Sequence, residues 1–98
     1  MLHIIRESPF HSKSFNHCIK ILSAEDALLF IEEGVFCALA DTDAAQLLLD
    51  ITKNQKIFVL APHAAEHGVL ERLIPNIGLI DFHGFVDLVI AHTSVNWR

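Results

Sequence analysis

Cysteine and histidine are the residue types of this sequence that could carry chemistry, and the chain has two cysteines and seven histidines. A cysteine can carry sulfur where a cation or a helix N-terminus stabilises its thiolate and where the sulfur is exposed. Cys18 has His17 and Lys20 close in sequence, but it also lies on an apolar helix stripe. Cys37 lies between two apolar residues, with no cation nearby. We expect both thiols to pack as small hydrophobic side chains, with Cys18 kept as the one candidate sulfur acceptor.

His63, Glu66 and His67 form the pattern H-x-x-E-H, in which two histidines on one helix face can bind zinc while the glutamate acts as a base. A catalytic zinc needs a third protein ligand and a cleft, and Gly68 cuts the expected helix short. A solvated helix face explains the pattern better, so we expect no metal and no cofactor. A small metal-dependent hydrolase that uses these three residues is the alternative from another functional class.

Three further titratable residues are expected to have structural or contact roles. His3 lies within an apolar run, where a histidine is usually hydrogen-bonded in the core or at its rim. Asp81 precedes a helix pattern, and capping that helix explains it better than proton transfer. His83, close to a strand end, is the histidine that we most expect to contact a partner.

Alternating strand and helix patterns must position these residues. Short apolar runs predict strands over residues 2–6, 27–31, 57–60 and 77–80. Three apolar stripes with helical spacing follow the first, second and fourth runs; their residues are Phe15, Cys18, Ile19 and Leu22, then Ala44, Leu47, Leu48 and Ile51, then Phe82, Phe85, Val86 and Val89. Pro62 suits the first turn of another helix, and residues 35–40 fit a helical turn or an extended segment. The polar tail, residues 93–98, receives no assignment.

Apolar strands separated by helices are typical of a parallel sheet that is covered on both faces. With right-handed crossovers, the sequence predicts one α/β domain over residues 1–98, with three α/β/α layers and a mostly parallel sheet of four to five strands. Ligands and reactive groups of such folds gather beyond the carboxyl ends of the strands. Those ends lead into residues 6–11, 32–34, 61–63 and 81–83, where any chemistry is expected.

Composition and charge narrow the classes of partner. The hydrophobic fraction of 52% is above the ~45–50% of typical soluble domains, so part of the apolar surface is expected to be covered by another subunit. The formal net charge is −5 and the basic residues are scattered, which argues against direct nucleic-acid binding. No apolar run reaches the ~18 residues that span a bilayer, and the first residues do not resemble a signal peptide. We expect a cytoplasmic protein with reduced cysteines.

Short motifs in a fixed order resemble the DsrH/TusB family of sulfur-relay subunits. They are Met1-Leu2-His3 with Ser8-Pro9-Phe10, the segment FIEEGVFCALADT over residues 30–42, and the units over residues 57–68 and 77–88. The resemblance covers nearly the whole chain and implies a DsrEFH-like fold. It also implies a non-carrier subunit of a heteromeric sulfurtransferase complex that supports 2-thiolation of the tRNA wobble uridine.

The same resemblance implies the partners and the division of labour. Sister subunits similar to TusD/DsrE and TusC/DsrF are expected in a heterohexamer with two copies of each, linked indirectly to TusA and TusE. In the catalytic sister, the persulfide cysteine follows the strand that corresponds to residues 57–60. This chain has Leu60-Ala61-Pro62-His63 there, so sulfur is expected on a sister subunit. Two alternatives stay open: a DsrH-type subunit of sulfur oxidation in which Cys18 participates, and a homo-oligomeric binding module without chemistry.

Overall fold

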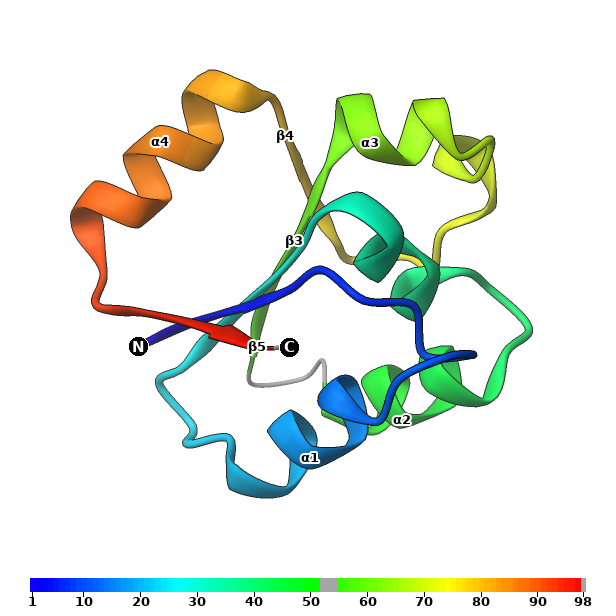
Figure 1. The fold of residues 1–98 in the computed structure, drawn as a ribbon, viewed down its shortest axis with the longest axis horizontal. Helices are drawn as coiled ribbons and strands as arrows, with labels where there is room; N and C mark the ends of the chain where they lie inside the picture. Colours follow the sequence, from blue (N-terminus) through cyan, green and yellow to red (C-terminus); the bar gives the residue numbers. More distant parts are fainter. Residues whose placement is uncertain (52–54, 98) are drawn as a thin grey trace.

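Five parallel strands form the central sheet of the computed structural model, which describes residues 1–51 and 55–97. The strands are β1 (Leu2–Ile5), β2 (Ala27–Phe30), β3 (Lys56–Leu60), β4 (Gly78–Ile80) and β5 (Ser94–Trp97). Their order across the sheet is β4-β3-β2-β1-β5, and each neighbouring pair in it is parallel (Figure 1). The predicted α/β class is therefore confirmed, and the sheet within the described residues is wholly parallel.

Helices cover both faces of this sheet. They are α1 (Ser14–Ile21), α2 (Asp43–Ile51), α3 (Ala61–Glu66) and α4 (Phe82–Ala91), with 3-10 helices η1 (Glu32–Ala38) and η2 (Leu70–Arg72). In Figure 1, α4 lies to the left of the strands, whereas α1 lies below them, α2 at the lower right and α3 at the upper right. The segment after β2 is thus helical rather than extended. None of the helices in the described ranges is long and apolar enough to cross a membrane.

Two clusters of buried side chains hold the helices against the sheet. The first joins the strands to the α1, α2, η1 and α3 side, and among its fully buried members are Phe15, Phe30 and Leu48. The second lies on the other face, where strand residues such as Leu29 pack with Phe85 and Leu88 of α4. Both faces of β1 and β2 are buried, which explains why their sequences are continuously apolar.

Apolar runs do not predict strand β5, because its four residues, Ser94–Trp97, alternate between polar and apolar. It pairs with the outer edge of β1, where Trp97 lies opposite Ile5. The Trp97 indole Nε1–H donates a 3.0 Å hydrogen bond to His3 Nδ1. The other ring nitrogen of His3, Nε2, lies 2.9 Å from Asp26 Oδ2. His3 is 2% exposed, so it is a buried, hydrogen-bonded histidine as the sequence predicts.

Candidate functional site

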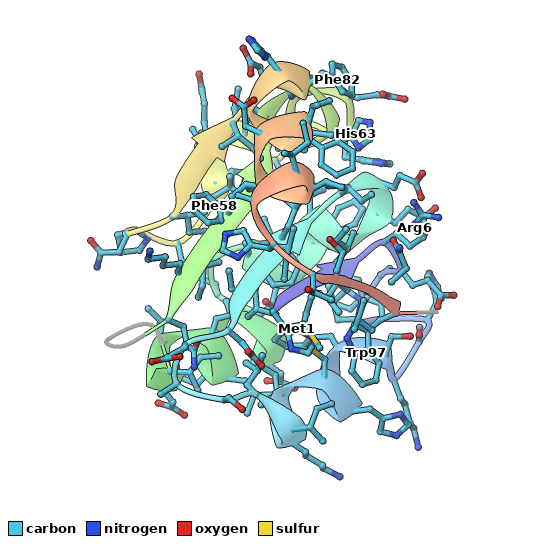
Figure 2. The ribbon with its side chains drawn as sticks, turned by 90° about the vertical axis from the view of Figure 1, so that its left-hand side faces the viewer. Met1, Arg6, Phe58, His63, Phe82 and Trp97 are labelled. Atoms are coloured by element: carbon cyan, nitrogen blue, oxygen red, sulfur yellow. The ribbon has the colours of Figure 1, made fainter. Side chains whose placement is uncertain are left out.

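Four strand ends bring polar and aromatic side chains to one edge of the sheet. Arg6 follows β1, Glu32 follows β2, His63 lies in the first turn of α3 after β3, and Phe82 begins α4 after β4. Figure 2 shows the labelled side chains of His63 and Phe82 beside each other, with Arg6 farther along the same edge. We call these four residues the carboxyl-edge cluster. It occupies the place where the sequence predicts any chemistry.

The imidazole of His63 is fixed in orientation by two contacts. The backbone N–H of Glu32 donates a 2.7 Å hydrogen bond to His63 Nδ1. The rings of His63 and Phe82 pack edge to face, with their centroids 5.6 Å apart and their planes at 76° to each other. Because Nδ1 accepts a hydrogen bond, the neutral ring carries its proton on Nε2. Within the described residues no hydrogen bond uses Nε2, so it can donate to a partner.

The loop after β2 is held in an unusual conformation. Glu32 has φ of +51°, in the left-handed region that non-glycine residues rarely adopt. Gly34 packs so closely that a Cβ there would lie 2.0 Å from the carbonyl oxygen of Ile5. The same Ile5 oxygen accepts a 3.0 Å hydrogen bond from the Ile31 N–H. The start of η1 is therefore clamped against the end of β1, which places Glu32 next to Arg6.

Arg6 and Glu32 form a weak ion pair at this edge. Arg6 Nε lies 3.7 Å from Glu32 Oε2, which is too long for a hydrogen bond, and both side chains are partly exposed. Among the described residues, Arg6 Nε is a buried donor without a hydrogen-bond partner. The cluster therefore offers the Nε2 donor of His63 beside the half-exposed ring of Phe82, whereas Arg6 Nε is enclosed. This combination can bind an acceptor group, and neither free cysteine belongs to it.

The two cysteines lie away from this edge, in the first core cluster. Cys18 in α1 and Cys37 in η1 are both 0% exposed, and both are free thiols. Burial, together with the nearby Asp26 carboxylate, raises the pKa of the Cys18 thiol to about 12. Burial also raises the pKa of the Cys37 thiol. Both sulfurs are therefore protonated at neutral pH and shielded from another protein's sulfur.

The predicted solvated helix face holds for Glu66 and His67, which are exposed, but not for His63. His63 is half-buried against Glu32 and Phe82, whereas the ring of His67 packs on Phe36 with centroids 5.2 Å apart. Glu66 is exposed. Across residues 1–51 and 55–97, no three His, Cys, Asp or Glu side chains gather in a way that could hold a metal ion. The sequence missed the role of His63 because Glu32 is 31 residues away.

The other two titratable residues named from the sequence are found at the start of α4. Asp81 Oδ1 accepts a 2.8 Å hydrogen bond from the N–H of Gly84, so Asp81 caps this helix as predicted. His83 is exposed. Its expected contact with a partner stays a prediction.

Comparison with known sequences gives consistent matches over almost the whole chain. A family model described as "DsrH like protein" matches residues 7–95. Protein TusB of Pectobacterium parmentieri is 33% identical over 92 residues, which cover 94% of this chain and 94% of that protein. Protein TusB of Yersinia pestis (strain Pestoides F) is 29% identical over 92 residues, with the same coverage of both.

Solved structures share the fold at low sequence identity. The ychN protein from E. coli superposes with a TM-score of 0.79 and 13% identity, covering 97% of this chain and 96% of that chain. Protein Tm0979 from Thermotoga maritima gives a TM-score of 0.63 and 21% identity, with 94% of each chain covered. At these identities the likeness shows the fold alone.

Proposed function

Because this chain belongs to the DsrH-like family, we propose that it is a non-carrier subunit of a sulfur-relay complex that supports 2-thiolation of the tRNA wobble uridine. Family membership supports the sulfur-relay role in general. The matches to proteins named TusB, rather than the structure, favour tRNA thiolation over sulfur oxidation.

The observation that carries the non-carrier role is the state of the thiols. Sulfur relay needs a thiolate that the sulfur of another protein can reach. The end of β3 and the start of α3 supply Leu60, Ala61 and Pro62 and no thiol, and both cysteines are fully buried and protonated. Sulfur would therefore stay on a sister subunit while this chain shapes the complex.

The proposed partners are sister subunits similar to TusD/DsrE and TusC/DsrF in a cytoplasmic heterohexamer, with TusA and TusE as indirect partners. The Nε2 donor of His63 suits the binding of a polar group of such a partner. Direct contact with tRNA is not expected, because the chain carries a net charge of −5.

The DsrH-type alternative, with Cys18 participating in sulfur oxidation, would require this thiol to become exposed and ionised. Its burial and its pKa of about 12 oppose that role in the folded chain. The hydrolase alternative is opposed by the separate contacts of His63 and His67.

Deletion of the gene, followed by mass spectrometry of tRNA nucleosides, tests the proposal. The deletion strain should lose most of its 2-thiouridine and regain it when the wild-type chain is supplied. Unchanged 2-thiouridine, together with a defect in sulfur oxidation, would contradict the tRNA role. Co-expression with both sisters should give one heteromeric peak by light scattering, and a chain that ignores both sisters would contradict the subunit role.

A further inference from the structure

The buried His3 joins a carboxylate to an indole inside the fold. Its Nε2 lies 2.9 Å from Asp26 Oδ2, and its Nδ1 accepts a 3.0 Å hydrogen bond from the Nε1–H of Trp97. An indole nitrogen can only donate, so the neutral His3 ring must carry its proton on Nε2, from which it donates to Asp26. The side chain of His3 is 3% exposed, so its ring depends on these two partners for its hydrogen bonds.

The strand that carries Trp97 is an edge strand. β5 follows α4, runs back along β1 and pairs with no other strand of the described sheet (Figure 1). None of its four residues is fully buried, unlike those of β1 and β2. Trp97 packs against the first core cluster, and its hydrogen bond to His3 ties it to the neighbouring strand. The docking of β5 thus depends on its backbone ladder and on Trp97.

We propose that His3 is a pH-sensitive switch, whose protonation releases the indole of Trp97 and loosens strand β5. Both ring nitrogens of an imidazolium are donors. Nε2–H would still donate to Asp26, in a stronger, charge-assisted hydrogen bond. Nδ1–H would face the N–H of Trp97, and two donors cannot bond to each other. Histidine is the side chain whose charge ordinarily changes between about pH 5 and 8, so mild acid would operate the switch. The inference is independent of the sulfur-relay role.

The charged groups at His3 suit such a switch. The carboxylate of Asp26 favours the imidazolium, whereas burial and the donor on Trp97 oppose it. Desolvation alone would raise the pKa of Asp26, but its hydrogen bonds hold this pKa below its ordinary value, so the carboxylate stays charged between about pH 5 and 8. The N-terminal amine of Met1 lies 3.3 Å from Asp26 Oδ1, so the amine and His3 bind different oxygens of one carboxylate.

The elements packed around His3 place neutral side chains beside it. His3 lies on the same face of β1 as Ile5, the face that α1 covers. Its neighbours in the sheet are Leu28 of β2 and Val95 of β5. Helix α1 buries Cys18 on this face, and burial raises the pKa of this thiol to about 12, so it is neutral. The other titratable side chains of α1 are exposed; they are His17 and Lys20. The two hydrogen-bond partners of the ring therefore govern its protonation.

Trp97 is the single tryptophan of the chain, so its fluorescence reports the switch directly. In the wild-type chain, the emission maximum should move to longer wavelength as the pH falls from about 8 to 5, because the released indole becomes hydrated. In His3→Asn, the amide oxygen can replace Nδ1 as the acceptor, but the amide takes up no proton, so the emission should stay constant. His17→Asn changes an exposed histidine of α1 and is the matched control, which should respond like the wild type. Circular dichroism verifies that both variants fold.

Nuclear magnetic resonance supplies two further measurements. Because the added proton and the Trp97 hydrogen bond exclude each other, removing the indole must favour protonation of His3. In Trp97→Phe, the His3 ring should become protonated at a pH about 0.5–1 higher than in the wild type, which corresponds to the loss of one hydrogen bond. In the wild-type chain, hydrogen exchange of the β5 amides, corrected for intrinsic rates, should rise about 5-fold relative to the β2 amides between about pH 8 and 5.

Three results would overturn the proposal. They are an unchanged Trp97 emission in the wild-type chain between about pH 8 and 5, the wild-type response in folded His3→Asn, and a His3 titration that is the same in Trp97→Phe and the wild type. If a variant does not fold, hydrogen exchange of the wild-type chain decides the question. Equal pH dependence of the β5 and β2 amides would then contradict the switch.

Discussion

The His63 imidazole accepts, through Nδ1, a 2.7 Å hydrogen bond from the backbone N–H of Glu32. This bond joins the first turn of α3 to the first residue of η1, whose N–H has no partner within its own helix. A side chain that follows β3 thus fixes the loop that follows β2. The orientation of the carboxyl-edge cluster depends on this hydrogen bond, on the ring contact between His63 and Phe82, and on the packing of η1 against β1.

Replacing His63 tests the structural value of that contact. His63→Ala should lower the free energy of unfolding by about 1 kcal/mol, because it leaves the Glu32 N–H without its acceptor. Urea denaturation provides the measurement. His83→Ala is the control, since His83 is exposed, and it should change stability by less than about 0.5 kcal/mol. Equal effects of the two substitutions would contradict the capping role of His63.

Gly34 and Gly68 should respond differently to alanine. In Gly34→Ala the new Cβ would lie 2.0 Å from the Ile5 oxygen, and backbone must shift, so we expect a loss of about 3 kcal/mol or more. Gly68→Ala meets no atom within 4 Å but must keep φ of +72°, which costs about 1 kcal/mol. Thermal or urea unfolding of both variants compares them. A Gly34→Ala protein as stable as Gly68→Ala would contradict the close approach of η1 to β1.

Both cysteines should resist thiol reagents in the folded protein. Cys18 and Cys37 are fully buried and their pKa values are raised, so neither supplies a reactive thiolate at neutral pH. Ellman's reagent should titrate almost no thiol in native buffer and two thiols per chain in denaturant. Rapid modification of Cys18 under native conditions would contradict its packed position and revive its role as a sulfur acceptor.

Asp26 should make the protein less stable in acid. Its partial desolvation alone would raise the pKa of this carboxyl, but hydrogen bonds from His3, the Ser23 N–H and the N-terminal amine together hold the pKa below its ordinary value. The unfolded chain therefore takes up a proton at higher pH than the folded chain. The contribution of the Asp26 carboxylate to the free energy of unfolding is complete above its pKa in the unfolded chain, about 3.9. It is lost as the pH falls through the lower pKa of the folded chain.

Urea denaturation of Asp26→Asn at several pH values between about 6 and 3 measures this effect. The variant should be less stable than the wild type at the upper end of this range, and the difference should shrink toward the lower end. Glu25→Gln, at the exposed neighbouring position, should keep the wild-type acid dependence. A constant difference between Asp26→Asn and the wild type over the whole range would contradict the lowered pKa.

The sequence predicts those parts of the fold that depend on local patterns. Strands buried on both faces, such as β1 and β2, have continuous apolar runs, and Asp81 stands at the start of a clear helix stripe. The packing of Cys18 follows from its place on the α1 stripe. Apolar runs do not predict strand β5, which is held by pairing with β1 and by the indole of Trp97. The alternation of Val95 and Trp97 with polar residues is nevertheless typical of a half-buried strand.

The candidate site was predictable in its place but not in its contacts. Parallel strands bring Arg6, Glu32, His63 and Phe82 to one edge, and this follows from topology alone. The hydrogen bond between Glu32 and His63 depends on the left-handed backbone of Glu32 and on the close packing of Gly34, neither of which a local pattern reveals. The H-x-x-E-H spacing predicts a solvated face, which describes Glu66 and His67, but tertiary contacts hold the half-buried His63 against Glu32 and Phe82.

Supplying a chain without cysteines to the deletion strain tests the central claim most directly. The variant Cys18→Ala with Cys37→Ala removes both sulfurs, so it cannot carry a persulfide; circular dichroism and co-purification with the sisters would establish that it folds and assembles. Mass spectrometry of tRNA nucleosides should then find 2-thiouridine restored to most of the wild-type level. If the folded, assembled variant restores no more 2-thiouridine than the empty vector, this chain carries sulfur itself and the non-carrier role is wrong.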